Sequence, residues 1–372
     1  MSVTYLRPLV TSLLMKRALV VLFVLSGCGA NQLPNHLDGA MGVKQAFLGG
    51  TGFNDMWFET LSNNNDPMEL QHWNGSALTK VAFPSGNPRL SCGKGGCFFS
   101  ASGMNVSRLD ASGTVTDLTD TIPSANATSL SVIATDDTTW LVQFVGATAN
   151  LFIWNGTSFV MAVAPPATSN AGNLRVVSDT LAFIPESNGP GAYRFDGTSW
   201  TPWQTMAQGF GGTVNLSNTI SLGSAGGVWS VFSPGGVGIP PALAPAGTQK
   251  SASPWELDHW TGTDFEHVEV SVPDAWMKDT DGYTGRALAF IGGKFGAVTW
   301  RVEREVGSPT EHHSLLFNAI TGTTMGPDVL LQTLPTCELG CTPTFVNTLP
   351  DGTVLTDTGG SQASLAWGKP GL

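Results

Sequence analysis

The stretch Ala192–Trp203 reads AYRFDGTSWTPW, and its centre predicts a β-hairpin. Asp196-Gly197 stands between two short alternating runs, and Asp-Gly favours a two-residue turn of type I′, in which both central residues have positive φ. A turn of this length would place Phe195 opposite Thr198. One face of the ribbon would then carry Tyr193, Phe195, Thr198 and Trp200. Because this face is aromatic, we expect it to be buried.

The same pattern recurs along the chain, which makes the hairpin a repeat. In each close copy a large apolar residue precedes the turn, and another follows five positions later on the same face. The close copies are Trp73–Leu78, Trp154–Phe159, Phe195–Trp200 and Trp260–Phe265, and the looser copies with a longer turn are Leu109–Val115 and Phe317–Thr323. The turn glycines are Gly75, Gly113, Gly156, Gly197, Gly262 and Gly322, with successive separations of 38, 43, 41, 65 and 60 residues.

These separations predict an all-β fold, a β-propeller of four-stranded blades, because spacings near forty residues are typical of one blade. The longer spacings need insertions, and the proline-rich stretch Pro234–Pro245 is one, since prolines lack the N–H that a central strand requires. Six hairpins plus the strand-rich remainder, Thr344–Trp367, predict seven blades. Six blades are the alternative, and a pair of β-sandwiches is the other architecture. In a ring the last blade meets the first, which leaves no open sheet edge.

Three further stretches resemble the kelch type of propeller, in which a strand ending in Gly-Gly begins a blade and a hairpin with an aromatic after its turn ends it. Ala46–Gly50 and Ala289–Gly293 resemble the Gly-Gly strand. Leu349–Leu355 is similar to the inner hairpin of bacterial kelch-like and galactose-oxidase-like propellers. The tyrosine that kelch repeats often carry is mostly absent, so the resemblance implies a degenerate kelch-like domain.

The first residues predict a sorting signal. Basic residues at positions 7, 16 and 17 precede an apolar run, Ala18–Leu25, which is too short to span a bilayer as a helix. The run ends in Leu25-Ser26-Gly27-Cys28, which resembles the lipobox of bacterial lipoproteins. This resemblance implies that residues 1–27 are removed and that Cys28 is acylated. An ordinary secretory signal with a chance cysteine is the alternative, and a start at Met15 would leave the same mature protein.

The mature chain would consist of the lipidated cysteine with a polar tether, residues 28–43, and a single propeller domain, residues 44–372. Gly29 follows the cysteine, and by resemblance to the sorting rule of enteric bacteria this favours the outer membrane. Without the signal the chain has 14 Lys and Arg against 28 Asp and Glu, a net charge of −14. Such an acidic chain is a poor partner for nucleic acid or anionic lipid, so the acyl chains would provide the membrane attachment.

Four further cysteines form two tight clusters, Cys92 with Cys97 and Cys337 with Cys341. In an oxidising compartment an even number of cysteines predicts disulfides, and each pair is close enough to join within its own loop. Cross-pairing between the clusters would tie the first third of the chain to its end and is the alternative. A four-thiolate zinc site is the other alternative, although C-x4-C with C-x3-C departs from the usual spacing.

No catalytic residue, metal site or cofactor is predicted. His312 and His313 are adjacent and would point to opposite faces of a strand, and parity separates His259 from His267 in the same way, so we expect surface or loop positions for all four. Asp279–Gly282 matches half of a calcium loop but lacks the third ligand and the distant Glu. The chain contains no G-x-S-x-G motif. A copper site of the galactose-oxidase kind would need paired tyrosines and histidines. The mature chain has two tyrosines and no such pairing, so we do not expect a copper site.

The sequence favours a membrane-anchored binding or scaffolding propeller in a bacterial cell envelope, with an envelope protein or a glycan as partner. The alternative is a glycan-active enzyme whose carboxylates come from separate blades, which would place two carboxylates about 5 to 10 Å apart in a central pocket. A purely structural envelope component is the third hypothesis. Most aromatic residues should pack between blades, while Trp229, Trp255 and Trp276 near the long loops are candidates for stacking on sugars.

Overall fold

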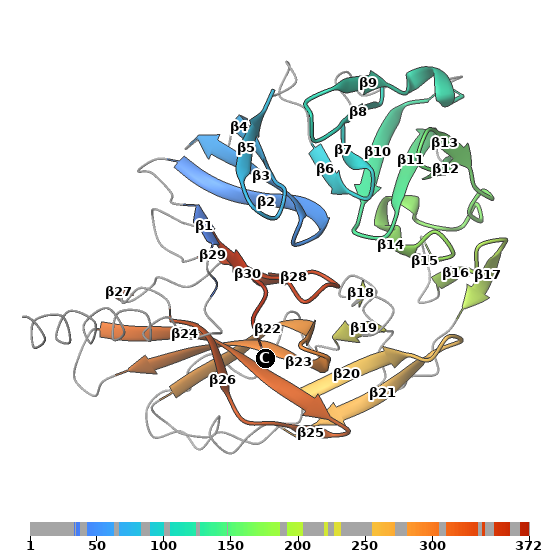
Figure 1. The fold of residues 1–372 in the computed structure, drawn as a ribbon. Coiled ribbons are helices and arrows are strands. Elements are labelled where there is room, and N and C mark those ends of the chain that lie inside the picture. Colours follow the sequence, from blue (N-terminus) through green and yellow to red (C-terminus); the bar gives the residue numbers. More distant parts are fainter. Residues whose placement is uncertain are drawn as a thin grey trace, which may run out of the picture.

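The computed structural model describes the chain as an almost entirely β-stranded protein (Figure 1). The described residues are 33, 35–37, 43–62, 67–82, 90–99, 105–123, 127–146, 148–186, 192–203, 219–221, 227–231, 255–271, 281–304, 310–333, 337–338, 346–357 and 365–371. Two short 3₁₀ segments, η1 (Thr119–Thr121) and η2 (Ala171–Asn173), are the helical elements of these ranges. Within the same ranges there is no helix of the length and apolar character needed to cross a membrane.

The strands form antiparallel sheets whose members follow one another along the chain. The first groups are β2 (Val43–Gly52), β3 (Asp55–Ser62), β4 (Pro67–Trp73) and β5 (Leu78–Val81), then β6 (Leu90–Gly93), β7 (Gly96–Phe99), β8 (Ser107–Leu109) and β9 (Val115–Asp117). Next come β10 (Ser129–Ala134), β11 (Thr139–Val145), β12 (Thr148–Trp154) and β13 (Phe159–Met161), then β14 (Arg175–Ser178), β15 (Leu181–Pro185), β16 (Ala192–Phe195) and β17 (Trp200–Trp203).

The second half of the chain repeats this order. It contains β18 (Thr219–Ser221), β19 (Val228–Val231), β20 (Trp255–Trp260) and β21 (Phe265–Val270). The following sheet has β22 (Asp281–Ile291), β23 (Lys294–Arg304), β24 (Thr310–Thr321) and β25 (Thr324–Met325), with β26 (Val329–Thr333) and β27 (Cys337–Glu338) also paired to β24. The last sheet has β28 (Val346–Thr348), β29 (Val354–Asp357) and β30 (Leu365–Gly368).

The last sheet takes its fourth strand from the beginning of the chain. β1 (Asn35–Leu37) pairs antiparallel with β30, so that Asn35 lies opposite Trp367 and Leu37 opposite Leu365. The sheet order β1-β30-β29-β28 therefore joins the two ends of the chain, as ring closure requires. β1 lies within residues 28–43, which the sequence predicts as a tether, so the sheet extends into that segment.

Neighbouring sheets pack face to face through aromatic rings, and together they form a β-propeller. Phe58 of β3 lies 4.9 Å from Trp367 of β30, measured between ring centroids, which joins the first sheet to the last. Trp140 of β11 lies 5.4 Å from Phe195 of β16, between two consecutive sheets. Phe183 of β15 contacts the next sheet along the chain, whose Trp260 lies 5.6 Å away. These contacts confirm the expectation that the aromatics pack between sheets.

The hairpin at Asp196 has a longer turn than its sequence predicts. Phe195 pairs with Trp200, not with Thr198, which leaves a four-residue loop instead of two residues. The cause is the Asp196 carboxylate, whose Oδ1 accepts the backbone N–H groups of Thr198 at 2.9 Å and Ser199 at 2.8 Å. An aspartate or asparagine that bonds to its own downstream backbone closes such a loop without the type I′ geometry. The predicted hairpin is present, and its predicted two-residue turn is wrong.

The repeated hairpins occupy equivalent places in successive sheets. Each of their turns, which we call the outer turns, joins the third strand of a sheet to the fourth. Asn74 and Asn155 accept backbone N–H groups in the same way as Asp196. Their glycines have positive φ: Gly75 91°, Gly113 84°, Gly156 105°, Gly197 94°, Gly262 102° and Gly322 59°. The proline-rich stretch 234–245 lies outside the described residues.

Candidate functional site at the inner turns

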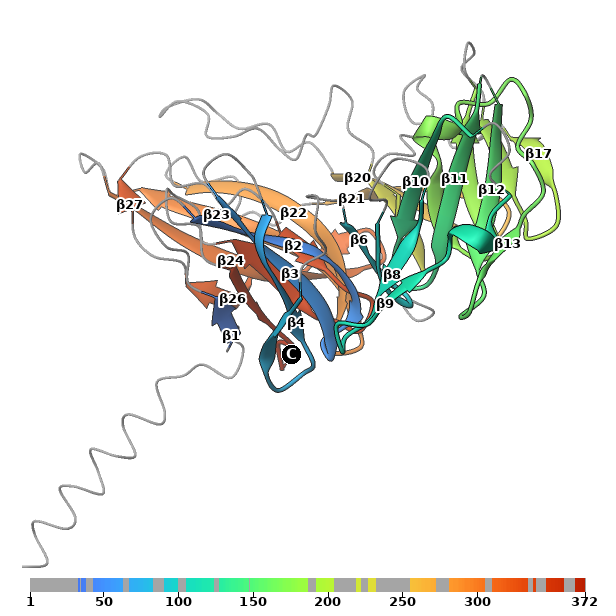
Figure 2. The ribbon, with the colours of Figure 1, turned by 90° about the horizontal axis from the view of Figure 1, so that it is seen from above.

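A second set of turns joins the first strand of each sheet to the second, and we call these the inner turns. The first strands of neighbouring sheets lie side by side; β2 and β6, for example, are paired in parallel at Gly49 and Cys92. Their turns therefore meet at one end of the ring, which Figure 2 shows from the side. The described inner turns are 53–54, 94–95, 135–138, 179–180, 292–293 and 349–353. The turn between β18 and β19 lies outside the described residues.

The inner turns hold one another in place. The backbone N–H of Phe53 donates to Asp351 Oδ2 at 2.7 Å, which ties the first sheet to the last. The backbone N–H of Lys94 donates to the carbonyl of Thr135 at 2.7 Å in the next sheet. Lys94 Nζ also lies 3.1 Å from Asp179 Oδ2, one sheet further on. Bonds between different sheets fix these turns relative to one another, so their side chains form one preorganised surface.

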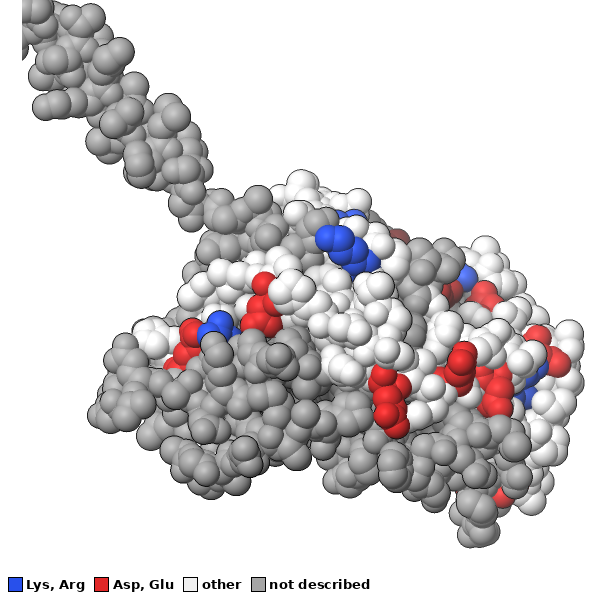
Figure 3. All heavy atoms as spheres, turned by 90° about the horizontal axis from the view of Figure 1, so that it is seen from below, with Lys and Arg blue, Asp and Glu red and all other residues white. Residues whose placement is uncertain are grey.

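The chain has 28 Asp and Glu against 17 Lys and Arg, and on the face drawn in Figure 3 side chains of both signs are scattered, several of them side by side. At the inner turns Asp351 is well compensated, because Lys369 Nζ lies 2.8 Å from its Oδ2 and the Thr353 hydroxyl donates to its Oδ1 at 2.6 Å. Burial raises the pKa of Asp351, but Lys369 and the N–H of Phe53 outweigh burial and hold the pKa below its usual value.

Asp136 has the opposite character. Burial in the turn and the neighbouring Asp137 carboxylate raise the pKa of Asp136 to about 6, and the carboxylate of Asp351 from another sheet adds to the shift. The inner turns therefore carry two different aspartates: Asp136, which is half-protonated near pH 6, and Asp351, which stays ionised. This pair comes from segments far apart in the sequence, and no local motif marks it. In the sequence, only the turn that carries Asp136 could be predicted, because Asp136-Asp137 stands between the alternating runs 129–134 and 139–145.

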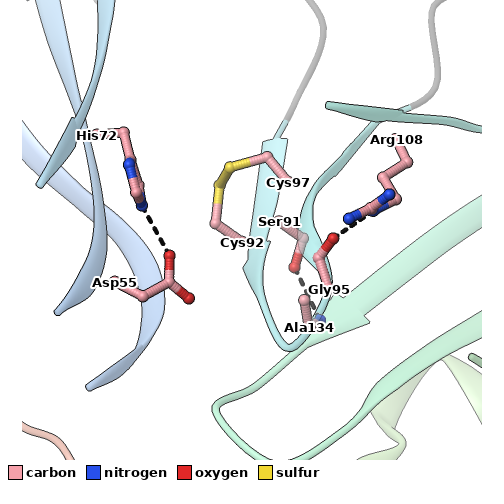
Figure 4. The surroundings of a disulfide bond; sticks show 8 residues. All are labelled: Asp55, His72, Ser91, Cys92, Gly95, Cys97, Arg108 and Ala134. Carbon is pink, nitrogen blue, oxygen red and sulfur yellow. Dashed lines mark hydrogen bonds and ion pairs between the residues drawn. A yellow bond between two sulfur atoms is a disulfide. The ribbon is translucent and has the colours of Figure 1, made fainter. Parts of the chain in front are cut away.

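The inner turn that carries Lys94 is held by a disulfide between Cys92 and Cys97, directly opposite each other on β6 and β7 (Figure 4). Both half-cystines are buried. Within the same sheet, Arg108 of β8 donates to the carbonyl of Gly95. This disulfide is one of the two local pairs that the spacing predicts. Cys337 lies in β27, whereas Cys341 and Cys28 lie outside the described residues.

A buried histidine, His72 of β4, bonds to Asp55, the first residue of β3 after the inner turn 53–54. His72 Nε2 lies 2.8 Å from Asp55 Oδ1, as Figure 4 shows, and the imidazole is only 7% exposed beneath Trp57, whose ring centroid is 4.5 Å away. Burial raises the pKa of Asp55, but hydrogen bonds from His72 and Thr51 outweigh burial and lower the pKa. No pattern in the sequence predicts this pair, because the partners lie 17 residues apart on different strands.

The other histidines lie on opposite faces of their strands, as predicted, but not all of them lie at the surface. His259 pairs with Glu266 and His267 with Asp258, so they face opposite sides of their sheet, and His267 Nδ1 lies 3.1 Å from Asp258 Oδ1. His312 is exposed, as expected.

His313 contradicts the expected surface position. It is buried and stacks on Trp300, with ring centroids 5.2 Å apart and planes 18° apart, because strand alternation turns it into the sheet interface. Trp229 and Trp255 lie in β19 and β20, whereas Trp276 and residues 279–280 lie outside the described part of the chain. Among the described residues no group of three or more His, Cys, Asp or Glu side chains is placed to hold a metal ion.

Comparison with known proteins gives likeness of fold alone. Neither a protein-family model nor a curated protein matches the sequence. Among solved structures, YCF48 from Cyanidioschyzon merolae is 12% identical with a TM-score of 0.44, over 89% of this chain and 98% of that one. An ulvan lyase of polysaccharide lyase family PL25 is 11% identical with a TM-score of 0.43, over 91% and 96%. The Cps50 (Swd1) β-propeller domain of Myceliophteria thermophila is 9% identical with a TM-score of 0.38, over 90% and 99%.

Proposed function

We propose that the protein is a lipid-anchored β-propeller that binds or scaffolds a partner in the bacterial cell envelope, on the outer membrane. The lipobox-like sequence before Cys28 supports the anchor and the signal peptide. Replacing Cys28 with Ala should release the protein from the membrane fraction, because the acyl chains would have no attachment point. Continued membrane retention of the Cys28→Ala protein, measured by fractionation, would contradict the anchor.

The proposed propeller has seven blades and a degenerate kelch-like pattern. Strands β2 to β9 form one eight-stranded sheet, which divides at its single parallel pair, Gly49 with Cys92, into two groups of four strands. This gives seven groups in all. The Gly-Gly stretches Ala46–Gly50 and Ala289–Gly293 belong to the first strands of two groups and the turns that follow. Both positions agree with the kelch-like interpretation of the sequence.

The observation that carries the binding role is the convergence of inner turns from several sheets on one fixed surface. Lys94 and Asp179 form an ion pair there, while Asp136 and Asp351 add carboxylates. A surface of fixed hydrogen-bonding groups suits a polar, hydroxyl-rich ligand such as a glycan, or a polar segment of an envelope protein.

An array of defined envelope and extracellular oligosaccharides tests this role. We expect Asp179→Asn to weaken any binding at least tenfold, because one carboxylate of the surface and the partner of Lys94 are lost together. The matched control is Asp196→Asn in an outer turn, where Asn already stands at the equivalent positions 74 and 155. Equal binding by wild type and both variants would contradict a ligand site at the inner turns.

The second candidate function is a glycan-active enzyme, favoured by the contrast between Asp136 and Asp351. Two carboxyl groups whose pKa values are pushed apart can divide the roles of general acid and general base. In this mechanism Asp136 would donate a proton to the departing oxygen, and the ionised Asp351 would take a proton from the water molecule that attacks the sugar carbon.

Release of reducing ends from a panel of polysaccharides tests this candidate. Activity should fall above about pH 6, where Asp136 loses its proton. It should also be lost in Asp136→Asn and kept in Asp196→Asn. Binding without release of reducing ends would leave the non-catalytic role and exclude the enzyme for that panel.

A further inference from the structure

The chain is fixed to the propeller almost as soon as it leaves the proposed anchor. Leu33 is only 5% exposed and packs in a core cluster with Leu331 and Ala366. Its backbone N–H donates to Gln332 Oε1 at 2.9 Å, across 299 positions of sequence. Two residues later, β1 joins β30, and Asn35 Nδ2 donates to the carbonyl of Trp367 at 3.4 Å. Leu33 is therefore the first described point at which the domain holds the chain.

The sequence between the anchor and this point is short. Only residues 29–32 separate Cys28 from Leu33. A fully extended chain spans at most 3.3 to 3.6 Å per residue, so Leu33 lies within about 18 Å of Cys28 whatever the conformation of these residues. An acylated Cys28 would sit at the lipid headgroups, and the propeller would be held close to them.

The direction of β1 shows on which side of the propeller the chain enters. The first and third strands of a sheet run the same way, so inner and outer turns lie on one side of the ring, which we call the turn side. β30 is a third strand and ends at Gly368 on the turn side, where Lys369 reaches Asp351 of an inner turn. β1 is antiparallel to β30, so its first residue, Asn35, lies at this end. β1 and the C-terminal end lie on the same side of the molecule in Figure 2.

We propose that the turn side faces the bilayer to which the protein is anchored, with the inner turns toward the headgroups and the opposite loops away from them. This inference rests on the proposed lipid anchor at Cys28. The aspartates of the turns and anionic headgroups would repel one another at contact, but salt screens this repulsion beyond about 8 Å. The short link therefore permits a gap while preventing the propeller from turning over.

Two fluorophores on one sheet test this orientation. Thr157 lies in the outer turn after β12, and Thr148 begins β12 at the opposite side of the ring. Both are exposed, and a seven-residue strand separates them by about 20 Å. The full acylated protein, labelled through Thr157→Cys or Thr148→Cys, is reconstituted in phosphatidylethanolamine and phosphatidylglycerol vesicles that carry an acceptor dye on the headgroups. Unsubstituted protein shows the background labelling of the natural cysteines.

We expect energy transfer to be at least twofold more efficient from position 157 than from position 148. Equal or reversed efficiencies in protein that floats with the vesicles would overturn the orientation and leave the anchor intact. Failure to float would contradict the anchor, and the orientation with it. As a further control, a flexible insertion of about 20 Gly and Ser residues after Gly29 should remove the difference, because a longer link lets the domain rotate.

Discussion

The outer and inner turns of this propeller differ in how much they bond to other sheets. An outer turn is closed by its own residues, as when Asp196, Asn74 or Asn155 accepts backbone N–H groups two and three positions ahead. An inner turn is also held by other sheets: Asp351 accepts the N–H of Thr353 in its own turn and, in addition, the N–H of Phe53 in the first sheet. The self-contained turn repeats in sequence because every sheet needs it, whereas the shared turn varies from sheet to sheet. Repetition therefore marks the fold, and variation at the inner turns marks the surface where function should be sought.

Breaking an outer turn should have the largest effect. Gly197→Val forces a β-branched residue to a φ of 94°, and its Cβ would meet Thr180 Cγ2 at 3.0 Å. We expect a loss of about 2–3 kcal/mol in the free energy of unfolding, measured by urea denaturation. Gly156→Val is the matched control, since nothing lies within 4 Å of its Cβ and only backbone strain remains. An unchanged melting temperature for Gly197→Val would show that this turn does not require positive φ.

Removing the disulfide tests how far an inner turn depends on covalent support. The double variant Cys92→Ala with Cys97→Ala should lose about 2 kcal/mol of stability, because the short loop it closes is no longer restricted in the unfolded chain. Urea denaturation of the oxidised protein gives the reference. We also expect reductant to shift the wild-type transition toward that of the variant. If the reductant instead lowered the stability of the double variant as much as that of the wild type, another disulfide would account for the change.

Asp136 should make stability depend on pH. Its raised pKa means that the folded protein holds this proton more tightly than the unfolded chain, so this contribution to stability is present below pH 4 and is lost as the pH rises through about 6. Asp136→Asn should therefore be more stable than wild type at pH 7, by about 1–2 kcal/mol, and no more stable at pH 4. Parallel urea curves at the two pH values check this sign, and a gain of equal size at both would refute it.

The smallest effect is expected from Asp196→Asn. Asn already makes the same turn at positions 74 and 155, so the melting temperature at pH 7 should change by less than about 2 °C. Acid should separate the two proteins, because the N–H groups of Thr198 and Ser199 lower the pKa of Asp196 to about 2. Wild type loses this contribution as the pH falls from about 4 toward 2, and the variant does not. Identical acid profiles would show that the turn gains nothing from the charge.

The sequence predicts the propeller through pairs such as Phe195 and Trp200, whose five-residue spacing reports a local hairpin. It does not predict the length of that hairpin's turn, because the Asp196 side chain competes with the type I′ backbone geometry. Contacts between segments far apart in the chain could not be predicted from the sequence either. Asp136 and Asp351 come within electrostatic range of one another only after the ring has closed, and β1 is a three-residue strand in a polar stretch that carries no periodic signal. Burial of His313 follows from sheet packing, which strand parity alone does not decide.

The strand that closes the ring also determines how the protein responds to force. If Cys28 is acylated as proposed, a pull from the membrane would enter the domain at Leu33 and then at β1, which pairs with β30 through three residue pairs. Under such a pull, either the acyl chains leave the bilayer or β1 separates from β30. The hairpin of Cys92 and Cys97 stays closed because a disulfide joins its strands. We expect the ring to open at its last sheet first, so that mechanical resistance of the anchored protein is set by this short ladder and not by the average sheet.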